Sequence, residues 1–178
     1  VTSAAALVVV VTPDLEAYQV AVRNEDSLIS YYTFDDETAA DSVAGNDGIL
    51  EGAVDFQTGL GGTVDRALIL DGQSHVALTE VEDFDFTDGT GTVEAWIRAD
   101  WDGSAGYNPC IIANRDGGPV RWSMHMSLNK AATGVWNGAS YAPQPISGAD
   151  GTWRHLVVVY TETGIEFYWD GELAGTSS

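Results

Sequence analysis

The sequence predicts an all-β protein made of short strands joined by frequent turns. Twenty glycines and many clusters of Asp, Asn, Ser and Thr divide the 178 residues into short segments, and these residue types favour turns. Residues 121–128 alternate strictly between apolar and polar side chains, so that Trp122 lies on one face of a strand and His125 on the other. A chain of this length can bury one substantial core. We therefore expect one domain with an N-terminal appendage.

The N-terminal appendage begins with an apolar segment. Residues 4–11 are all apolar and include four valines, and Thr12 and Pro13 follow them. This composition predicts a strand over residues 4–12 that is buried on both faces, because exposed valines and unpaired backbone groups promote aggregation. A signal-peptide remnant is the alternative, since an h-region has a similar length. The residues of this assembly strand are Ala4, Ala5, Ala6, Leu7, Val8, Val9, Val10 and Val11.

A short helix is predicted over residues 14–22. Leu15, Tyr18 and Val22 recur at helical spacing on one face, and Asp14 stands at the N-cap position. The strand and the helix together form a predicted N-terminal extension of residues 1–27. We expect the helix to pack over one end of the main domain.

Strands separated by turns are predicted throughout residues 28–178. Period-two patterns or short apolar runs bounded by turn residues define each of them. The predicted strands cover residues 28–34, 49–56 with a bend at Gly52, 67–70, 75–78, 92–98, 111–113, 121–128, 156–160 and 165–169.

The segment 151–175, GTWRHLVVVYTETGIEFYWDGELAG, combines Gly-x-Trp-x-His, two strands around a polar turn, and Asp-Gly-x-Leu-x-Gly. It resembles a hairpin of the laminin-G-like domains in the concanavalin A-like lectin/glucanase superfamily. The resemblance extends over residues 28–178 and implies a two-sheet antiparallel jelly-roll sandwich that is usually non-catalytic, often extracellular and often calcium-binding. Five further segments resemble successive blocks of the family in its order: YYTFDD (31–36), DSVAGNDG (41–48), GLGGTVDRALILDGQSHVAL (59–78), GTVEAWIRAD (91–100) and IIANRD (111–116).

The last strands of the family, which follow this hairpin and close the sheets, have no counterpart in the sequence. One hypothesis is that residues 4–11 of a neighbouring molecule fill the gap, which would make the protein a structural or adhesive subunit of a fibre or pilus-like polymer. Residues 13–27 are also long enough to let the strand fold back into its own domain. A third explanation is that the sequence is a fragment of a longer protein.

Charge restricts the partners of this chain. Asp and Glu number 27 against 7 Lys and Arg, which gives a formal net charge of -20. Nucleic acid and anionic membrane surfaces are therefore unfavourable partners, because like charges repel. No apolar run approaches the length of a membrane-spanning helix. Cations are the natural complement, although the charge also keeps a protein hydrated in a saline habitat.

A calcium site is predicted in the loop of residues 41–48. Asp41, Asn46 and Asp47 supply side-chain oxygens within a short, glycine-containing loop, and calcium takes six to eight oxygen ligands. The resemblance adds Asp71 as a further candidate, since the Asp-Gly after the next long strand lies near a calcium site in the family. The alternative is that these side chains only form turn hydrogen bonds.

Aromatic residues are the candidates for ligand contact. The resemblance assigns three of the six tryptophans, Trp96, Trp153 and Trp169, to the sandwich interior. Loop segments 100–109 and 137–144 are better placed to bind a glycan or an extracellular protein. The predicted ligand-contact residues are Trp101, Tyr107, Trp136 and Tyr141, with His125 on the polar face of its strand.

Catalysis is not expected from this sequence. The acidic stretch 80–88 lacks the strand alternation that holds two glycosidase carboxyls about 5 Å apart. The three histidines have no metal-ligand spacing, and Cys110, the single cysteine, excludes an intrachain disulfide. The sequence therefore favours a non-catalytic extracellular or cell-surface protein. The self-assembling subunit is the first hypothesis, and a calcium-dependent carbohydrate- or protein-binding module of a larger secreted protein is the second.

Overall fold

A computed structural model describes nine segments of the chain, and these form two units, one within residues 10–83 and one from residue 84 onward. The two units are described separately. The predicted strand over residues 4–12 lies outside the described segments, and the predicted boundary at residue 28 stays a prediction. The described residues are 15–43, 45–78, 84–85, 90–99, 109–115, 120–126, 133–136, 141–144 and 150–177.

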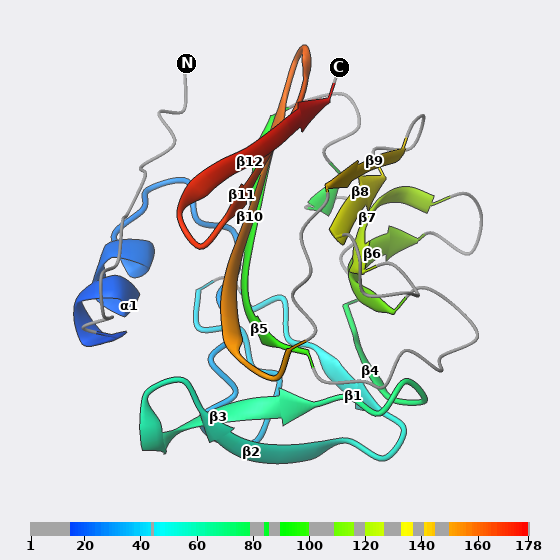
Figure 1. Cartoon of the computed structure of the whole chain (residues 1–178). Helices are drawn as coiled ribbons and strands as arrows, with labels where there is room; N and C mark the ends of the chain where they lie inside the picture. The colour runs from blue at the N-terminus through cyan, green and yellow to red at the C-terminus, as the bar shows by residue number, and fades with distance from the viewer. Residues whose placement is uncertain are drawn as a thin grey trace. The chain divides into compact units, whose positions relative to one another are not determined.

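The described residues of the first unit form one helix and two antiparallel strand pairs (Figure 1). The helix α1 (Leu15–Arg23) confirms the predicted helix and buries Tyr18 on its apolar face. No helix in the described segments is long and apolar enough to cross a membrane. The strand pairs join β1 (Ile49–Glu51) with β4 (His75–Ala77) and β2 (Asp55–Gly59) with β3 (Gly62–Ile69).

The structure of this unit confirms the predicted bend at Gly52 but not the strand predicted over residues 28–34. The bend at Gly52 is confirmed, because Gly52 has φ +84 between β1 and β2, and a Cβ there would lie 2.9 Å from the carbonyl oxygen of Gln73. The strand predicted over residues 28–34 is wrong, since these residues form no strand. Their backbone bonds to the following loop instead: the Tyr31 amide donates to Asp41, and the Tyr31 carbonyl accepts from the Ser42 amide.

In the second unit, the described residues form two four-stranded antiparallel sheets. One sheet has the order β12-β11-β10-β5 and the other has the order β6-β7-β8-β9. The strands β8, β9 and β12 fall where the sequence patterns predicted none. The bounds are β5 (Gly91–Arg98), β6 (Cys110–Arg115), β7 (Val120–Met126), β8 (Thr133–Trp136), β9 (Tyr141–Gln144), β10 (Trp153–Thr161), β11 (Gly164–Trp169) and β12 (Glu172–Ser177).

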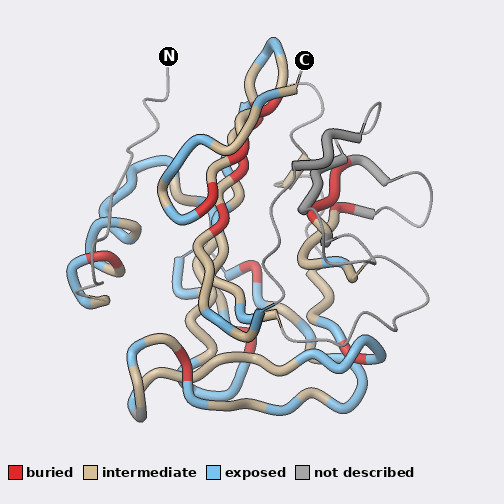
Figure 2. The backbone as a smooth tube through the Cα atoms, in the orientation of Figure 1, coloured by how far each residue is buried: buried red, intermediate tan, exposed pale blue. Residues whose placement is uncertain are grey.

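The core of the second unit lies between its two sheets. Trp122 and Met124 of β7 pack with the buried residues of β10 and β11. Figure 2 shows the alternation of buried and half-buried positions along β10 and β11. Each fully buried side chain such as Leu156 contributes roughly 2 kcal/mol by removal from water. The predicted two-sheet antiparallel sandwich is thus confirmed. The remaining core residues are Val158, Tyr160, Ile165, Phe167 and Trp169.

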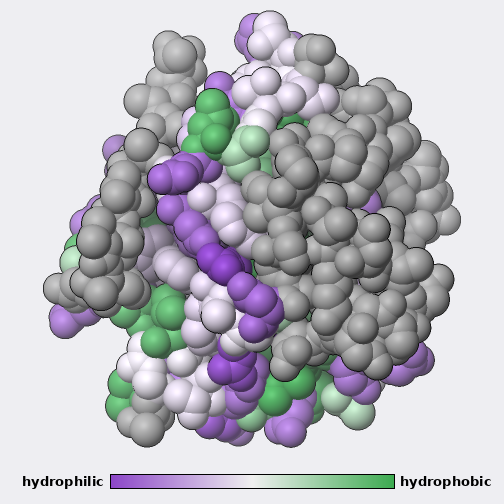
Figure 3. Space-filling view, viewed as in Figure 1, coloured by the Kyte–Doolittle hydropathy of each residue, from purple (hydrophilic) through white to green (hydrophobic). Residues whose placement is uncertain are grey.

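The three tryptophans assigned to the interior divide between two environments. Trp169 is 9% exposed and belongs to the core, as predicted. Trp96 and Trp153 lie on the opposite face of the same sheet and are half-buried, which corrects the prediction. The reason is the strand alternation, which directs their neighbour Ile97 towards the core. On the face drawn in Figure 3, hydrophilic and hydrophobic groups are interspersed among the described residues.

Candidate functional site

One candidate site is the face of sheet β6–β9 that is opposite to the core. In β7, Ser123 and His125 alternate with the core residues Trp122 and Met124, so they occupy the other face. Ser123 is also directly paired with Trp136 of β8. Residues paired in this way lie on the same face of a sheet.

Backbone register brings together three of the predicted ligand-contact residues. Trp136 is paired with Tyr141 of β9, and His125 is paired with Gly134 of β8. His125, Trp136 and Tyr141 therefore lie on one face, which we call the outer face of sheet β6–β9. The two remaining candidates, Trp101 and Tyr107, lie outside the described residues.

His125 is less hydrated than the alternating pattern suggested. Its neighbour Ser123 is only 8% exposed, so this face is not the fully solvated one that the sequence predicted. The Oγ atom of Ser123 lies 3.5 Å from Nδ1 of His125, and burial lowers the pKa of His125. A neutral imidazole with one donor and one acceptor nitrogen suits hydrogen bonding to uncharged hydroxyl groups.

The loop of the predicted calcium site is held by its own hydrogen bonds. Asp41 Oδ1 accepts from the amides of Tyr31 (2.9 Å) and Val43 (3.0 Å), and Asp41 Oδ2 accepts from the Asn46 amide (3.1 Å). The Asp41 amide in turn donates to Asp47 Oδ1 at 2.8 Å. The side-chain amide of buried Asn46 donates to Ser30 Oγ at 2.8 Å. Hydrogen bonds within this loop thus bring Asp41, Asn46 and Asp47 close together.

Asp71 belongs to a separate turn after β3. Its Oδ1 atom accepts from the amides of Gln73 (2.8 Å) and Ser74 (2.9 Å) and from the Ser74 hydroxyl (2.9 Å). These bonds lower the pKa of Asp71, the Gln73 amide having the largest effect. Within the described segments no group of three or more His, Cys, Asp or Glu side chains is arranged to hold a metal ion. Three of the predicted ligands share one loop and Asp71 lies in another turn, and calcium binding stays a prediction.

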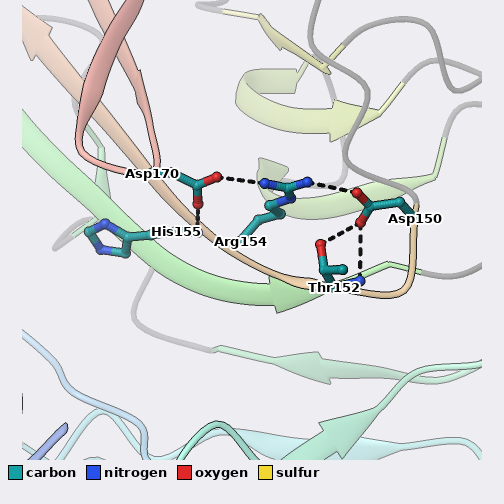
Figure 4. Close-up of polar contacts among 5 residues, drawn as sticks. All are labelled: Asp150, Thr152, Arg154, His155 and Asp170. Atoms are coloured by element: carbon teal, nitrogen blue, oxygen red, sulfur yellow. Dashed lines mark hydrogen bonds and ion pairs between the residues drawn. The ribbon is translucent and has the colours of Figure 1, made fainter. Parts of the chain in front are cut away.

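The recognisable hairpin of the sequence contains a network of five residues (Figure 4). Arg154 of β10 binds Asp150 at 2.7 Å and Asp170 at 2.9 Å. Asp170 also accepts from the His155 amide at 2.9 Å, and Asp150 accepts from the Thr152 hydroxyl at 2.6 Å. The bonds from Thr152 and then Arg154 hold the pKa of Asp150 well below its usual range.

This network explains why the hairpin has the Asp-Gly pair. Asp170 (φ 50) and Gly171 (φ 82) are both left-handed, as a tight hairpin turn requires. In that conformation the Asp170 carboxylate reaches back to β10, and the Asp170 amide donates to the His155 carbonyl at 2.8 Å. The motif that identifies the family therefore has a structural role in fastening the β11–β12 turn to β10.

A second face with aromatic residues was not predicted from the sequence. The rings of Trp96 and His155 stack with centroids 4.7 Å apart, and His155 Nε2 lies 2.6 Å from Glu94 Oε1. The Arg98 guanidinium lies 5.4 Å from the centre of the Trp153 ring on the same face. The charged residues at alternate positions of β5 could have indicated that this face is not core.

The comparisons with known proteins agree with the sandwich. The structure is similar to domain 4 of AbnA, a GH43 extracellular arabinanase from Geobacillus stearothermophilus, solved in complex with arabinotriose, with a TM-score of 0.60 and 18% sequence identity. The match covers 84% of this chain and 74% of that one. No curated protein matches the chain. A laminin-G family described as the concanavalin A-like lectin/glucanases superfamily matches residues 70–178, and the chain belongs to this superfamily.

Proposed function

We propose that this protein is a non-catalytic carbohydrate-binding module of an extracellular protein, and that the outer face of sheet β6–β9 binds the saccharide. The observation that carries the proposal is the register that places His125, Trp136 and Tyr141 on one sheet face. Aromatic residues supply large, rigid contact area for the apolar face of a sugar ring. Gly134, paired with His125, adds no side chain beside the imidazole.

The structural neighbour gives independent support for a saccharide ligand. That arabinanase domain was solved in complex with arabinotriose. Arabinotriose is therefore the first probe for this chain, beside trisaccharides of xylose and glucose. A binding face made from a rigid sheet is also consistent with recognition by a preformed surface.

Isothermal titration calorimetry with these trisaccharides tests the proposal. We expect Trp136→Ala and Tyr141→Ala each to weaken binding about 5-fold, because stacking contributes about 1 kcal/mol per ring. Trp153→Ala, an aromatic substitution on the other sheet, is the matched control and should bind as the parent does. Circular dichroism of every variant establishes that it folds. Parental binding by both outer-face variants would refute the assignment of the site.

A second candidate function is self-assembly through residues 4–11. The supporting observation is that β12 is an edge strand of the described sheet, and an edge strand offers unpaired backbone groups to a further strand. In this proposal the assembly strand of one molecule pairs with β12 of the next. Negative-stain microscopy and gel filtration, with and without residues 1–12, test it. A monomer with the same elution volume in both forms would exclude the polymer.

Calcium dependence is a further proposal about the same module. Asp41, Asn46, Asp47 and Asp71 are the proposed ligands, and binding would require some of their turn hydrogen bonds to be exchanged for the ion. Calorimetric titration with calcium, in the parent and in the Asp41→Ala and Asp71→Ala variants, measures this directly. An isotherm that neither substitution changes would remove these residues from any calcium site.

A further inference from the structure

Two carboxyl groups of the first unit are in hydrogen-bonding contact. Asp35 belongs to an exposed loop, Asp65 belongs to β3, and a hydrogen bond joins their side chains. Two ionised carboxylates cannot hydrogen-bond to each other, because neither carries a donor hydrogen. We propose that Asp35 and Asp65 share one proton and act as an acid latch, which holds residues 34–37 on β3 and releases them when the proton is lost. This latch is independent of the proposed saccharide site.

Asp65 is the fixed member of the pair. Its Oδ2 atom accepts a hydrogen bond from the Gly61 amide at 2.6 Å. The hairpin also fits closely around this carboxyl group, since a Cβ atom on Gly59 would lie 2.5 Å from Asp65 Oδ2. A bond from a backbone amide favours the ionised form of a carboxyl group. Asp65 therefore keeps its place on the hairpin after deprotonation, and Asp35 is the member that moves.

Asp35 lies in a loop with a strained backbone. Phe34 (φ 62) and Glu37 (φ 60) are left-handed although neither is glycine, and this conformation costs free energy for residues with a side chain. The Glu37 amide donates to the Phe34 carbonyl at 3.0 Å and closes the turn. A strained turn persists only while the surrounding contacts hold it. Loss of the contact with Asp65 therefore favours relaxation of residues 34–37.

Charged side chains reach the pair from the loop and from β3. Glu37 contacts the guanidinium of Arg66, and the Arg66 amide donates to Asp35 Oδ1 at 3.0 Å. The other neighbouring elements contribute uncharged groups. The β2–β3 turn contributes the backbone amides of residues 60 and 61, and α1 approaches that turn through Leu15, whose Cδ2 atom would lie 2.3 Å from a Cβ on residue 61.

The sign of the pH dependence follows from these surroundings. Burial and the neighbouring Asp35 raise the pKa of Asp65 above 3.8, against the effect of the amide bonds. Below the raised value the pair holds its proton and the latch is closed. As the pH rises through that value the second charge appears, and two like charges at close range repel. The latch therefore opens towards neutral pH.

Arg66 offers the released carboxylate a second partner. Its Nε atom is buried and has no hydrogen-bond partner among the residues that the structure describes. Asp35 already accepts from the backbone amide of the same residue. One guanidinium can bind two carboxylates, as Arg154 does in the second unit. In the open state Asp35 thus turns from Asp65 to the Arg66 side chain, and the Arg66 amide loses its acceptor.

Contacts on both sides of the loop keep this movement local. The Phe34 ring stacks on the Tyr32 ring with centroids 6.3 Å apart, and the Tyr32 hydroxyl donates to the Asn46 carbonyl at 2.6 Å. After the loop, the carbonyl of buried Ala39 accepts from the Gly48 amide at 2.8 Å. Neither set of contacts includes the shared proton. The test therefore needs a readout at individual residues.

Hydrogen exchange of the Arg66 amide, followed by NMR from pH 3.5 to 7 and corrected for the intrinsic exchange rate, is that readout. We expect protection to fall about 10-fold over this range, which corresponds to one pKa unit of interaction. The Ser42 amide, which donates to the Tyr31 carbonyl, should keep its protection. Asp65→Asn supplies a permanent donor to Asp35 and should retain the acid value at pH 7. Asp36→Asn, a matched substitution in the same loop, should keep the parental pH dependence.

The carbon-13 signal of the Asp65 carboxyl group gives a second test. Its titration midpoint in the parent should lie above pH 3.8. Asp35→Asn should lower the proton affinity of Asp65 about 10-fold, or one pH unit, and Asp36→Asn should leave it unchanged. These measurements decide the question even if Asp65→Asn does not fold.

Three results would overturn the latch. One is an Asp65 midpoint that Asp35→Asn does not change. Another is Arg66 protection that is equal at pH 3.5 and 7 in the parent. The third is an equal loss of protection at Ser42, which would mean that the whole unit opens. Loss or retention of saccharide binding has no bearing on these results, so the latch and the proposed function fail separately.

Discussion

The guanidinium of Arg154 lies 2.9 Å from the carboxylate of Asp170, which is 16 residues further along the chain. Asp170 occupies the β11–β12 turn, and its second oxygen accepts a hydrogen bond from the backbone amide of His155. One carboxylate thus connects a turn to two successive residues of β10. This arrangement gives the family motif a physical role that can be measured.

Replacing Asp170 by Asn should destabilise the protein by about 1 kcal/mol, because a partly exposed ion pair with additional hydrogen bonds contributes on that scale. Asn accepts the left-handed backbone at this position, so the change isolates the charge. Urea denaturation measures the difference. Glu162→Gln, which removes an exposed acid from the β10–β11 turn, is the control. Equal midpoints for the two variants would contradict a stabilising role of the ion pair.

Removal of a central side chain should have a larger effect. Leu156 is fully buried, so Leu156→Ala should lower the free energy of unfolding by about 2–5 kcal/mol, from lost burial and the remaining cavity. Leu173, which is 56% exposed, provides the control. Leu173→Ala should change stability by less than about 0.5 kcal/mol. Similar losses in both variants would mean that the two sheets do not share the described core.

His125 should make the protein sensitive to mild acid. Burial lowers its pKa in the folded state below 6.5, so the unfolded chain takes up a proton first as the pH falls. Stability is then full above about pH 6.5 and decreases as the pH falls through the lowered value. His125→Gln should remove this component of the pH dependence, as measured by thermal melts between pH 7.5 and 5. His75→Gln, at an exposed position, should retain it.

Asp65 should have the opposite dependence on pH. Partial burial and the neighbouring Asp35 raise the pKa of Asp65 in the folded state. Its contribution to stability is therefore greatest below pH 3.8 and is lost as the pH rises through the raised value. Asp65→Asn retains an acceptor for the Gly61 amide and should raise the melting temperature at pH 7. A lower melting temperature than that of the exposed control variant Asp26→Asn would contradict this prediction.

Sequence patterns were sufficient for the short helix and for several strands, but they did not predict β8, β9 and β12. The alternation around Trp122 and the apolar run of β10 each predicted a strand whose alternate residues form the core. The prediction over residues 28–34 was wrong, because the Tyr31 backbone bonds to the loop at Asp41 and not to a neighbouring strand. This hydrogen bonding depends on a residue ten positions further along the chain. A period-two pattern carries no information about such a partner.

The sequence identifies candidate ligand residues by their residue type, but it does not predict their positions relative to one another. The sequence places Trp136 and Tyr141 in or near predicted loops, yet they are directly paired in β8 and β9. The family resemblance predicts Trp96 and Trp153 in the interior, yet strand alternation puts them on the opposite face of their sheet.

The sequence by itself determined the all-β class, the family resemblance, the acidity and the turn at Asp170 and Gly171, because these follow from local composition and short-range backbone preferences. Only the tertiary structure decided which strands share a sheet, which face of each sheet is core, and that His125, Trp136 and Tyr141 lie on one surface. These features depend on register between strands distant in the chain, which is selected by the packing of two whole sheets against each other.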